Sequence, residues 1–128
     1  MVLHKVLPTL KGLIIKGNSV LLLRKKPTAY HKDGMYDLPG GHICFGENIA
    51  GCLQRTIKED VNLLVEISKP INAWTVIKDN KVELVGTTFL CKYKGISAMP
   101  NNSKQKSATF LNLFSIISIR KSPRRCVI

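Results

Sequence analysis

Acidic residues are scarce in this 128-residue chain, which has eight Asp and Glu against twenty Lys and Arg, for a formal net charge of +12. Such an excess invites a nucleic-acid partner. However, residues 101–128 hold six of the basic residues and no acid, so this segment alone carries +6. Like-charged tails are commonly solvated, and only Phe110 and Phe114 supply aromatic rings there. The charge therefore does not favour a nucleic-acid function for the chain.

The sequence also lacks paired cysteines and long apolar runs. Cys44, Cys52, Cys91 and Cys126 form no CxxC pair, and the three histidines have no zinc spacing, so we expect reduced thiols. The apolar stretches fall short of the about 20 residues that span a bilayer. No sustained apolar core of a secretory signal stands at the N-terminus. These absences predict a cytoplasmic protein that does not insert into a membrane.

The length fits one domain, and turn residues divide it into alternating element types. Gly17-Asn18 and Asp79-Asn80 are expected to close hairpins. A loop is predicted from Pro27 to Gly41, because Pro and Gly recur there. The expected strands are Pro8 to Lys16, Ser19 to Lys26, Leu63 to Ser68, Ile71 to Lys78 and Lys81 to Tyr93. Hairpins around a central helix predict a mixed β-sheet in an α/β protein of the α+β type.

A helix is predicted from about residue 48 to 61. Asn48 is a good N-cap, and Asn62 suits the left-handed residue that ends a helix. Ile49, Leu53 and Ile57 recur every four residues, so we expect this stripe to pack against the sheet.

Three of the eight acids, Glu47, Glu59 and Asp60, gather around this helix and the glycine-rich turn before it. Helical geometry places Thr56, Glu59 and Asp60 on one side, with Arg55 one turn before Glu59. Adjacent carboxylates beside an open glycine turn offer hard oxygen ligands for Mg²⁺, which prefers one or two carboxylates plus substrate phosphates. The arrangement therefore predicts metal-assisted phosphate chemistry.

The stretch "GGHICFGENIAGCLQRTIKEDVNL" resembles the signature of the Nudix hydrolases, in which Gly, Glu, an Arg-Glu pair, two acids and Gly recur at fixed spacing. The matching positions are Gly41, Glu47, Arg55, Ile57, Glu59 and Leu63, and "LPGG" before them is also usual in that family. The resemblance covers about residues 8 to 95. It departs at three positions, where Thr56 and Asp60 stand for Glu and Asn62 stands for Gly.

The resemblance implies an α/β/α sandwich and hydrolysis of the pyrophosphate bond of nucleoside diphosphate derivatives, which are small-molecule substrates. Glu59, Asp60 and the Gly41 carbonyl would bind Mg²⁺ or Mn²⁺, and the metal would activate the attacking water. Arg55 would orient Glu59. Glu47 would brace the junction of loop and helix, or reach the metal through water.

The departures keep a second function open. Thr56 removes one anionic ligand from the metal face, and residues 84–128 contain no acid, although the family usually has one in a late loop. The alternative is therefore a catalytically weakened or inactive Nudix-fold domain that binds nucleotide or RNA. For substrate binding, Arg24 could reach a phosphate, and Tyr36, like Tyr30 or Trp74, could stack on a base.

The basic C-terminal segment divides the chain into a Nudix-like domain, residues 1–100, and an atypical end, residues 101–128. Phe110, Leu113, Phe114 and Ile117 share one helical face, which predicts a docked helix. A reading-frame change is the rival origin of this composition. Both accounts predict that residues 120–128 stay loose. The sequence leaves the oligomeric state open, a homodimer included.

Overall fold

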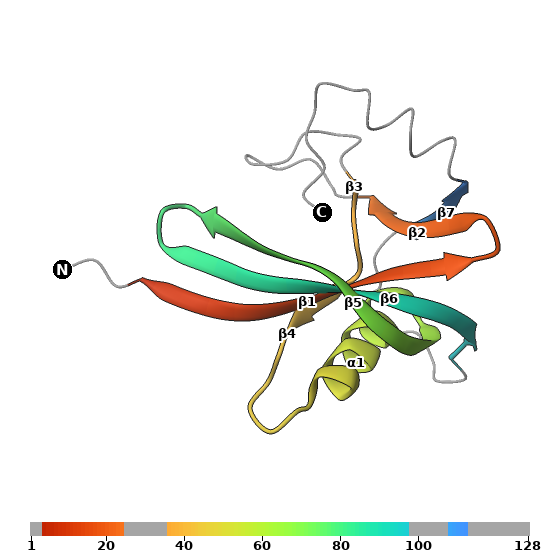
Figure 1. Cartoon of the computed structure of the whole chain (residues 1–128), viewed down its shortest axis with the longest axis horizontal. Helices are drawn as coiled ribbons and strands as arrows, with labels where there is room; N and C mark the ends of the chain where they lie inside the picture. The colour runs from red at the N-terminus through yellow and green to blue at the C-terminus, as the bar shows by residue number, and fades with distance from the viewer. Residues whose placement is uncertain (1–3, 25–35, 98–107, 113–128) are drawn as a thin grey trace.

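The computed structural model describes residues 4–24, 36–97 and 108–112. These residues form seven strands and one helix, which confirms the predicted α+β class (Figure 1). No helix in these ranges is long and apolar enough to cross a membrane. The elements are β1 (Lys5–Lys16), β2 (Ser19–Arg24), β3 (Tyr36–Asp37), β4 (Gly40–His42), α1 (Ile49–Val61), β5 (Leu63–Lys78), β6 (Val82–Ile96) and β7 (Ala108–Asn112).

The strands build one mixed sheet in the order β3-β2-β1-β6-β5, while β4 pairs with β1 and β7 pairs with β2. β1 runs parallel to β6, and each of the other pairs is antiparallel. Figure 1 shows β1, β6 and β5 as long strands that cross the molecule side by side. The mixed sheet expected from the hairpins is confirmed.

Both predicted hairpin turns are present. Gly17 has φ +59°, and Asp79 and Asn80 each have φ +55°, a region that these residue types tolerate better than most. β1 begins at Lys5, three residues before the predicted Pro8, because its parallel pairing with β6 already starts at Lys5 opposite Val82. The chain therefore turns where its sequence indicates, but pairs over a longer range.

Two predictions about strands and loops are wrong in detail. The strands expected on either side of Lys69 and Pro70 form one strand, β5, with irregularities in its pairing between Ile67 and Lys69 and between Pro70 and Asn72. β5 is an edge strand, where a missing N–H is tolerated. In the expected loop, residues 36–37 and 40–42 are short strands, and residues 25–35 lie outside the described part.

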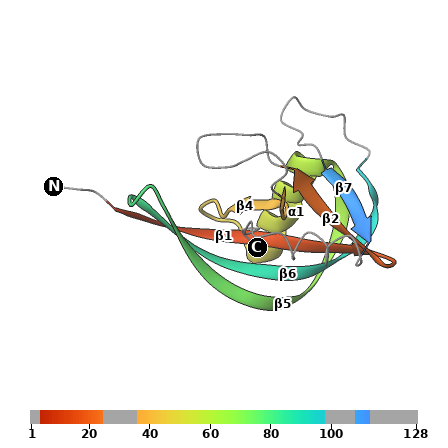
Figure 2. The ribbon, with the colours of Figure 1, turned by 90° about the horizontal axis from the view of Figure 1, so that it is seen from above.

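The main core lies between the sheet and α1, which covers one face of β1 and its neighbours (Figure 2). Leu53 and Ile57 are fully buried there, as predicted. Gly12 lets the helix approach β1, since a Cβ at this position would lie 2.8 Å from Cδ1 of Ile57. Ile49, however, is 48% exposed, because it is the first helical residue and the buried contacts begin one turn later, at Cys52.

The C-terminal segment contributes a strand where a helix was expected. Ala108–Asn112 pairs with β2, and two successive side chains of this strand pack in different apolar clusters. Phe110 packs on the α1 side, with its ring 5.9 Å from that of Tyr93, whereas Leu111 packs on the opposite cluster. This alternation has the period of a strand, not of a helix. Residues 113–128 lie outside the described part, so the expected loose end and the domain boundary near residue 100 stay predictions.

Candidate active site

The helix that carries the acidic residues has well-defined ends. The Asn48 side chain accepts a hydrogen bond from the backbone N–H of Gly51 at 2.7 Å. Asn62 adopts the left-handed conformation, with φ +59°, and its N–H donates to the carbonyl of Lys58 at 2.9 Å. Both predicted caps are confirmed, and Asn62 therefore fills the structural position of the glycine that the Nudix pattern has there.

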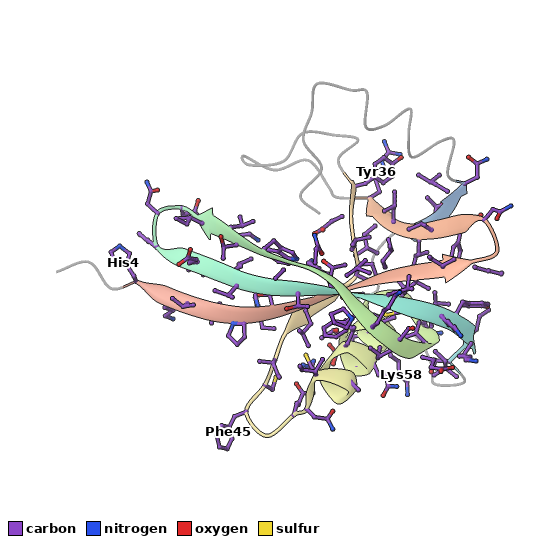
Figure 3. The ribbon with its side chains drawn as sticks, in the orientation of Figure 1. His4, Tyr36, Phe45 and Lys58 are labelled. Carbon is purple, nitrogen blue, oxygen red and sulfur yellow. The ribbon has the colours of Figure 1, made fainter. Side chains whose placement is uncertain are left out.

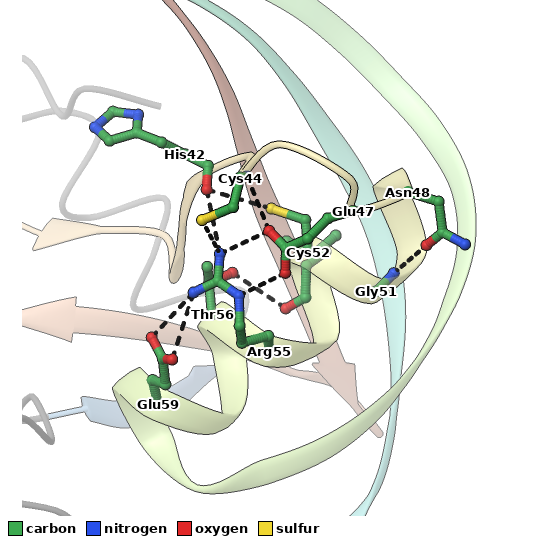
Figure 4. A network of polar contacts seen from close by, with 10 residues as sticks. His42, Cys44, Glu47, Asn48, Gly51, Cys52, Arg55, Thr56 and Glu59 are labelled. Carbon is green, nitrogen blue, oxygen red and sulfur yellow. Dashed lines mark hydrogen bonds and ion pairs between the residues drawn. The ribbon is translucent and has the colours of Figure 1, made fainter.

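Glu47 joins the turn before α1 to the helix itself. One carboxylate oxygen accepts from Nε of Arg55 at 2.6 Å, and the other accepts from Nη2 of Arg55 and from the backbone N–H of Cys44, both at 2.9 Å. These bonds, the Arg55 side chain first, lower the pKa of Glu47 from 4.5 to about 2. Glu47 is thus held in a brace, which we define as Cys44, Glu47 and Arg55 with the His42 carbonyl (Figure 4).

Arg55 also reaches the acidic end of the helix. Its Nη1 donates to both oxygens of Glu59 at 3.3 and 3.4 Å, and its Nη2 donates to the His42 carbonyl at 3.3 Å. Figure 4 shows the guanidinium between Glu47 and Glu59. The hydrogen bond with Glu47 raises the pKa of Arg55 above its ordinary value, so the cation is permanent. Arg55 therefore forms an ion pair with Glu59, whose side chain remains 49% exposed.

Asp60 contacts the glycine turn directly. Its Oδ2 accepts from the backbone N–H of Gly40 at 3.3 Å. Glu59 and Asp60 thus approach β4 at two places, since Arg55 links Glu59 to the His42 carbonyl and Asp60 bonds Gly40. Asp60 therefore contacts the glycine turn directly, whereas Glu59 reaches it only through Arg55.

The pairing of β4 with β1 bears on the ligand role expected of the Gly41 carbonyl. Gly12 donates to the Pro39 carbonyl and Ile43 donates to the Pro8 carbonyl, which marks two hydrogen-bonded pairs of the β1–β4 ladder. Gly41, opposite Leu10, lies midway between them. Because hydrogen-bonded pairs recur every second residue of an antiparallel ladder, regular pairing turns the peptide groups of Gly41 toward β1. The N–H of Gly40 instead donates to Asp60 of α1. The carbonyl expected at Gly41 is therefore better supplied by Gly40.

Thr56 lies beneath this turn, on the side of α1 that Asp60 also presents to β4, but it is buried there. Thr56 is only 5% exposed, and its hydroxyl donates a hydrogen bond to the Leu53 carbonyl at 3.2 Å. Its Cγ2 lies 3.0 Å from the position that a Cβ on Gly41 would occupy. Sequence spacing gives the angular position of a residue around the helix, but only the packing of β4 against α1 decides which of these positions are buried.

The donor set fits a hard divalent cation that brings most of its own ligands. Glu59, Asp60 and the Gly40 carbonyl offer oxygen atoms only, the type that Mg²⁺ and Mn²⁺ accept. Within the described ranges, no group of three or more His, Cys, Asp or Glu side chains is arranged to hold a metal ion. The residues therefore suit an ion completed by waters and substrate phosphates, as Mg²⁺ usually is.

The predicted substrate residues neighbour each other elsewhere on the sheet. Arg24, the last residue of β2, pairs with Tyr36 of β3, and Tyr36 packs partly buried on the cluster of Val20, Leu22 and Leu38 (Figure 3). Figure 3 also shows Phe45, fully exposed, at the tip of the turn before α1.

Sequence reasoning missed a polar group on the sheet face opposite α1. Nζ of Lys11 lies 3.1 Å from Oδ2 of the buried Asp37, and Nδ1 of His42 lies 3.0 Å from Oγ1 of Thr9. The alternation of β1 could have indicated it, since Thr9 and Lys11 fall between the buried apolar residues.

Comparison with known proteins agrees with this architecture. The NUDIX domain profile matches residues 10–122. An ADP-ribose pyrophosphatase of Methanocaldococcus jannaschii is 25% identical over 103 residues, which are 80% of this chain but 59% of that protein, so the chain spans less than two thirds of that relative's length.

Solved structures show the same fold. A NUDIX hydrolase of Nitrosomonas europaea aligns with a TM-score of 0.73 at 16% identity and covers 91% of this chain and 81% of its own. A MutT NUDIX hydrolase of Burkholderia pseudomallei aligns with a TM-score of 0.71, also at 16% identity, over 95% and 90% of the two chains. With the domain profile covering most of its length, the chain belongs to the NUDIX domain family.

Proposed function

We propose that this protein is a divalent-metal-dependent hydrolase that cleaves the pyrophosphate bond of nucleoside diphosphate derivatives. The observation that carries the proposal is the pair of adjacent carboxylates beside the glycine turn: Asp60 bonds the N–H of Gly40, and Arg55 links Glu59 to the His42 carbonyl. The relative named as an ADP-ribose pyrophosphatase supports this substrate class.

The chain's own residues would divide the work. Glu59, Asp60 and the Gly40 carbonyl would hold Mg²⁺ or Mn²⁺, which when bound neutralises the diphosphate and lowers the pKa of a water. Arg55 fixes the Glu59 carboxylate through the Nη1 contacts, while Glu47 fixes Arg55. This arrangement would orient the Glu59 carboxylate before the substrate enters, while the long contacts of 3.3 and 3.4 Å leave its oxygens able to turn to the cation.

A second candidate is a catalytically weakened NUDIX domain that binds nucleotide or RNA. It is favoured by Thr56, which places a buried neutral side chain beneath the turn where the family pattern has a carboxylate. The lack of any Asp or Glu in residues 84–128 points the same way. The two candidates predict the same fold and differ in turnover.

The test is hydrolysis of a panel of nucleoside diphosphate derivatives, ADP-ribose included, with Mg²⁺ and with Mn²⁺. Glu59→Gln keeps the shape and removes the charge, so we expect a loss in kcat on the order of 10³-fold. Glu66→Gln is the matched control, since Glu66 also pairs with a cation, Lys94, on an exposed surface. Mn²⁺ binding, measured by electron paramagnetic resonance, should weaken in Glu59→Gln alone. Turnover that is equal in both variants would overturn the assignment of Glu59, and no turnover of any substrate would favour the binding domain.

A further inference from the structure

One row of residues crosses four strands on the sheet face opposite α1. The pairing aligns His42 of β4 with Thr9 of β1, Thr9 with Gly86 of β6, and Gly86 with Trp74 of β5. Paired residues point to the same face. That face is opposite the helix, because Leu10, the next residue of β1, packs in the α1 core. Thr9 and Gly86 are small, so His42 and Trp74 supply the bulky side chains of the row.

Trp74 is held flat against the middle of the sheet. Its Nε1–H donates to Oγ1 of Thr88, which is 1% exposed, at 3.0 Å. Its six-membered ring lies over Gly86, where any Cβ would overlap the ring atoms. The indole is partly exposed and belongs to neither apolar cluster of the described residues. Its polar atom is therefore satisfied and its orientation fixed, although it does not serve as a core residue.

The surroundings of this ring are suited to a negatively charged ligand. Lys78 lies four residues after Trp74 on β5, so its side chain extends from the same face of the sheet as the indole ring. Lys11 also extends from β1 on this face, but its Nζ lies 3.1 Å from Oδ2 of Asp37, so the contact with a phosphate would fall to Lys78. An aromatic face beside cationic groups is the combination that binds a planar base joined to phosphate.

His42 connects this face to the acidic site. Its side chain bonds Thr9 on the Trp74 face, whereas its carbonyl accepts from Arg55 on the α1 side. From β4 to β5 the row spans three strand spacings, roughly 14 Å. A dinucleotide-like diphosphate held at the β4 edge could extend over this row to the ring of Trp74.

We propose that Trp74, positioned by Gly86 and Thr88, is the residue on which the base of the substrate stacks, and that it makes the protein selective for nucleoside over simple sugar diphosphates. The inference rests on the proposed function for the class of substrate. It adds the part of the substrate that is recognised and the residue that recognises it.

Trp74 is the only tryptophan in the chain, so the native protein reports on its own site. AMP and ribose 5-phosphate differ by the base alone, and neither contains a pyrophosphate bond to be cleaved. We expect saturable quenching of the intrinsic tryptophan fluorescence by AMP and no such change with ribose 5-phosphate or with inorganic pyrophosphate. An equal response to AMP and ribose 5-phosphate, or no response to AMP, overturns the proposal.

Kinetics with ADP-ribose then separate stacking from packing. Trp74→Leu should raise KM on the order of 10-fold, while kcat stays within about twofold. Trp74→Phe retains a flat ring and should recover most of the affinity. Gly86→Ala keeps Trp74 but displaces its ring, so it should raise KM as Trp74→Leu does. If Trp74→Leu lowers kcat and the melting temperature and leaves KM unchanged, the residue is structural and the proposal fails.

The experiments distinguish this proposal from the one on which it rests. Quenching by AMP without hydrolysis of any diphosphate would support stacking on Trp74 and reject the hydrolase in favour of a nucleotide-binding domain. Hydrolysis that depends on Glu59 without an AMP response would support the hydrolase and reject stacking.

Discussion

The two ends of the contact between α1 and β4 differ in how tightly they are built. At the brace, Glu47 receives bonds of 2.6 and 2.9 Å from Arg55 and Cys44, and its side chain is 21% exposed. At the acidic end, the contacts of Glu59 with Arg55 and of Asp60 with Gly40 are 3.3 to 3.4 Å long, and Glu59 is 49% exposed.

This difference suggests that the brace has a structural role and that the acidic end has a chemical one. Short charge-assisted bonds contribute more than long ones, so the brace fixes the turn in the folded chain itself. The longer contacts at the acidic end orient Glu59 and Asp60 less firmly. Their oxygens can therefore exchange the contacts with Arg55 and Gly40 for contacts with a cation and its phosphate ligands. Both ends depend on the position of β4. We therefore expect substitutions in β4 to have the largest effect on the protein, substitutions at the acidic end a smaller one, and substitutions in the brace the smallest.

Changing β4 should have the largest effect. Gly40 has φ +148°, and a Cβ there would overlap the Leu10 carbonyl, so we expect Gly40→Ala to lower the free energy of unfolding by about 3 kcal/mol or more. Gly41→Ala is the matched control, since its Cβ would meet only the Thr56 side chain, with Cγ2 at 3.0 Å and Cβ at 3.5 Å, and should cost about 1 kcal/mol. Denaturant unfolding measures both. Equal losses in the two variants would contradict the described path of β4.

A carboxylate at position 56 should strengthen metal binding at the acidic end. In Thr56→Glu, a buried charge is added near Glu59 and Asp60, so the melting temperature in chelator should fall by about 5 °C. Mn²⁺ should then bind about 10-fold more tightly than to the wild type, by titration calorimetry, because the metal compensates the added charge. Thr56→Gln has the same size without the charge and should show the lower stability but no gain in metal affinity. Identical metal binding in the two variants would show that position 56 lies too far from the cation.

Removing the charge of the brace should have the smallest effect, seen as a change in how the melting temperature depends on pH. The pKa of Glu47 is lowered from 4.5 to about 2 in the folded protein, so its ionised form stabilises the fold fully above pH 4.5. This contribution is lost as the pH falls toward 2. The melting temperature of the wild type should exceed that of Glu47→Gln by a constant amount above pH 4.5, and the gap should narrow below it. A gap unchanged down to pH 2 would mean that Glu47 acts through packing and not through its charge.

Local sequence predicted the helix and both of its ends because capping depends on neighbouring residues alone. Asn48 and Asn62 cap α1 as expected, and Leu53 and Ile57 are buried. The same local logic failed at Phe110, because the pairing of Ala108–Asn112 with β2 outweighs a helical spacing of apolar residues. The local prediction also split β5 into two strands at Pro70, because proline has no backbone N–H to donate. An edge strand tolerates that missing donor, so β5 continues through Pro70.

By itself, the sequence determined the family resemblance, the position of the acidic residues on a capped helix and the mixed class of the sheet, because fixed spacings and turn residues encode these features locally. Only the tertiary structure decided which side of that helix β4 covers, and hence that Thr56 is buried and that Gly40, not Gly41, presents its peptide to Asp60. Only pairing between distant strands aligned Trp74 with His42, residues 32 positions apart. The reason is physical: hydrogen-bonded register acts between segments that a sequence pattern describes separately.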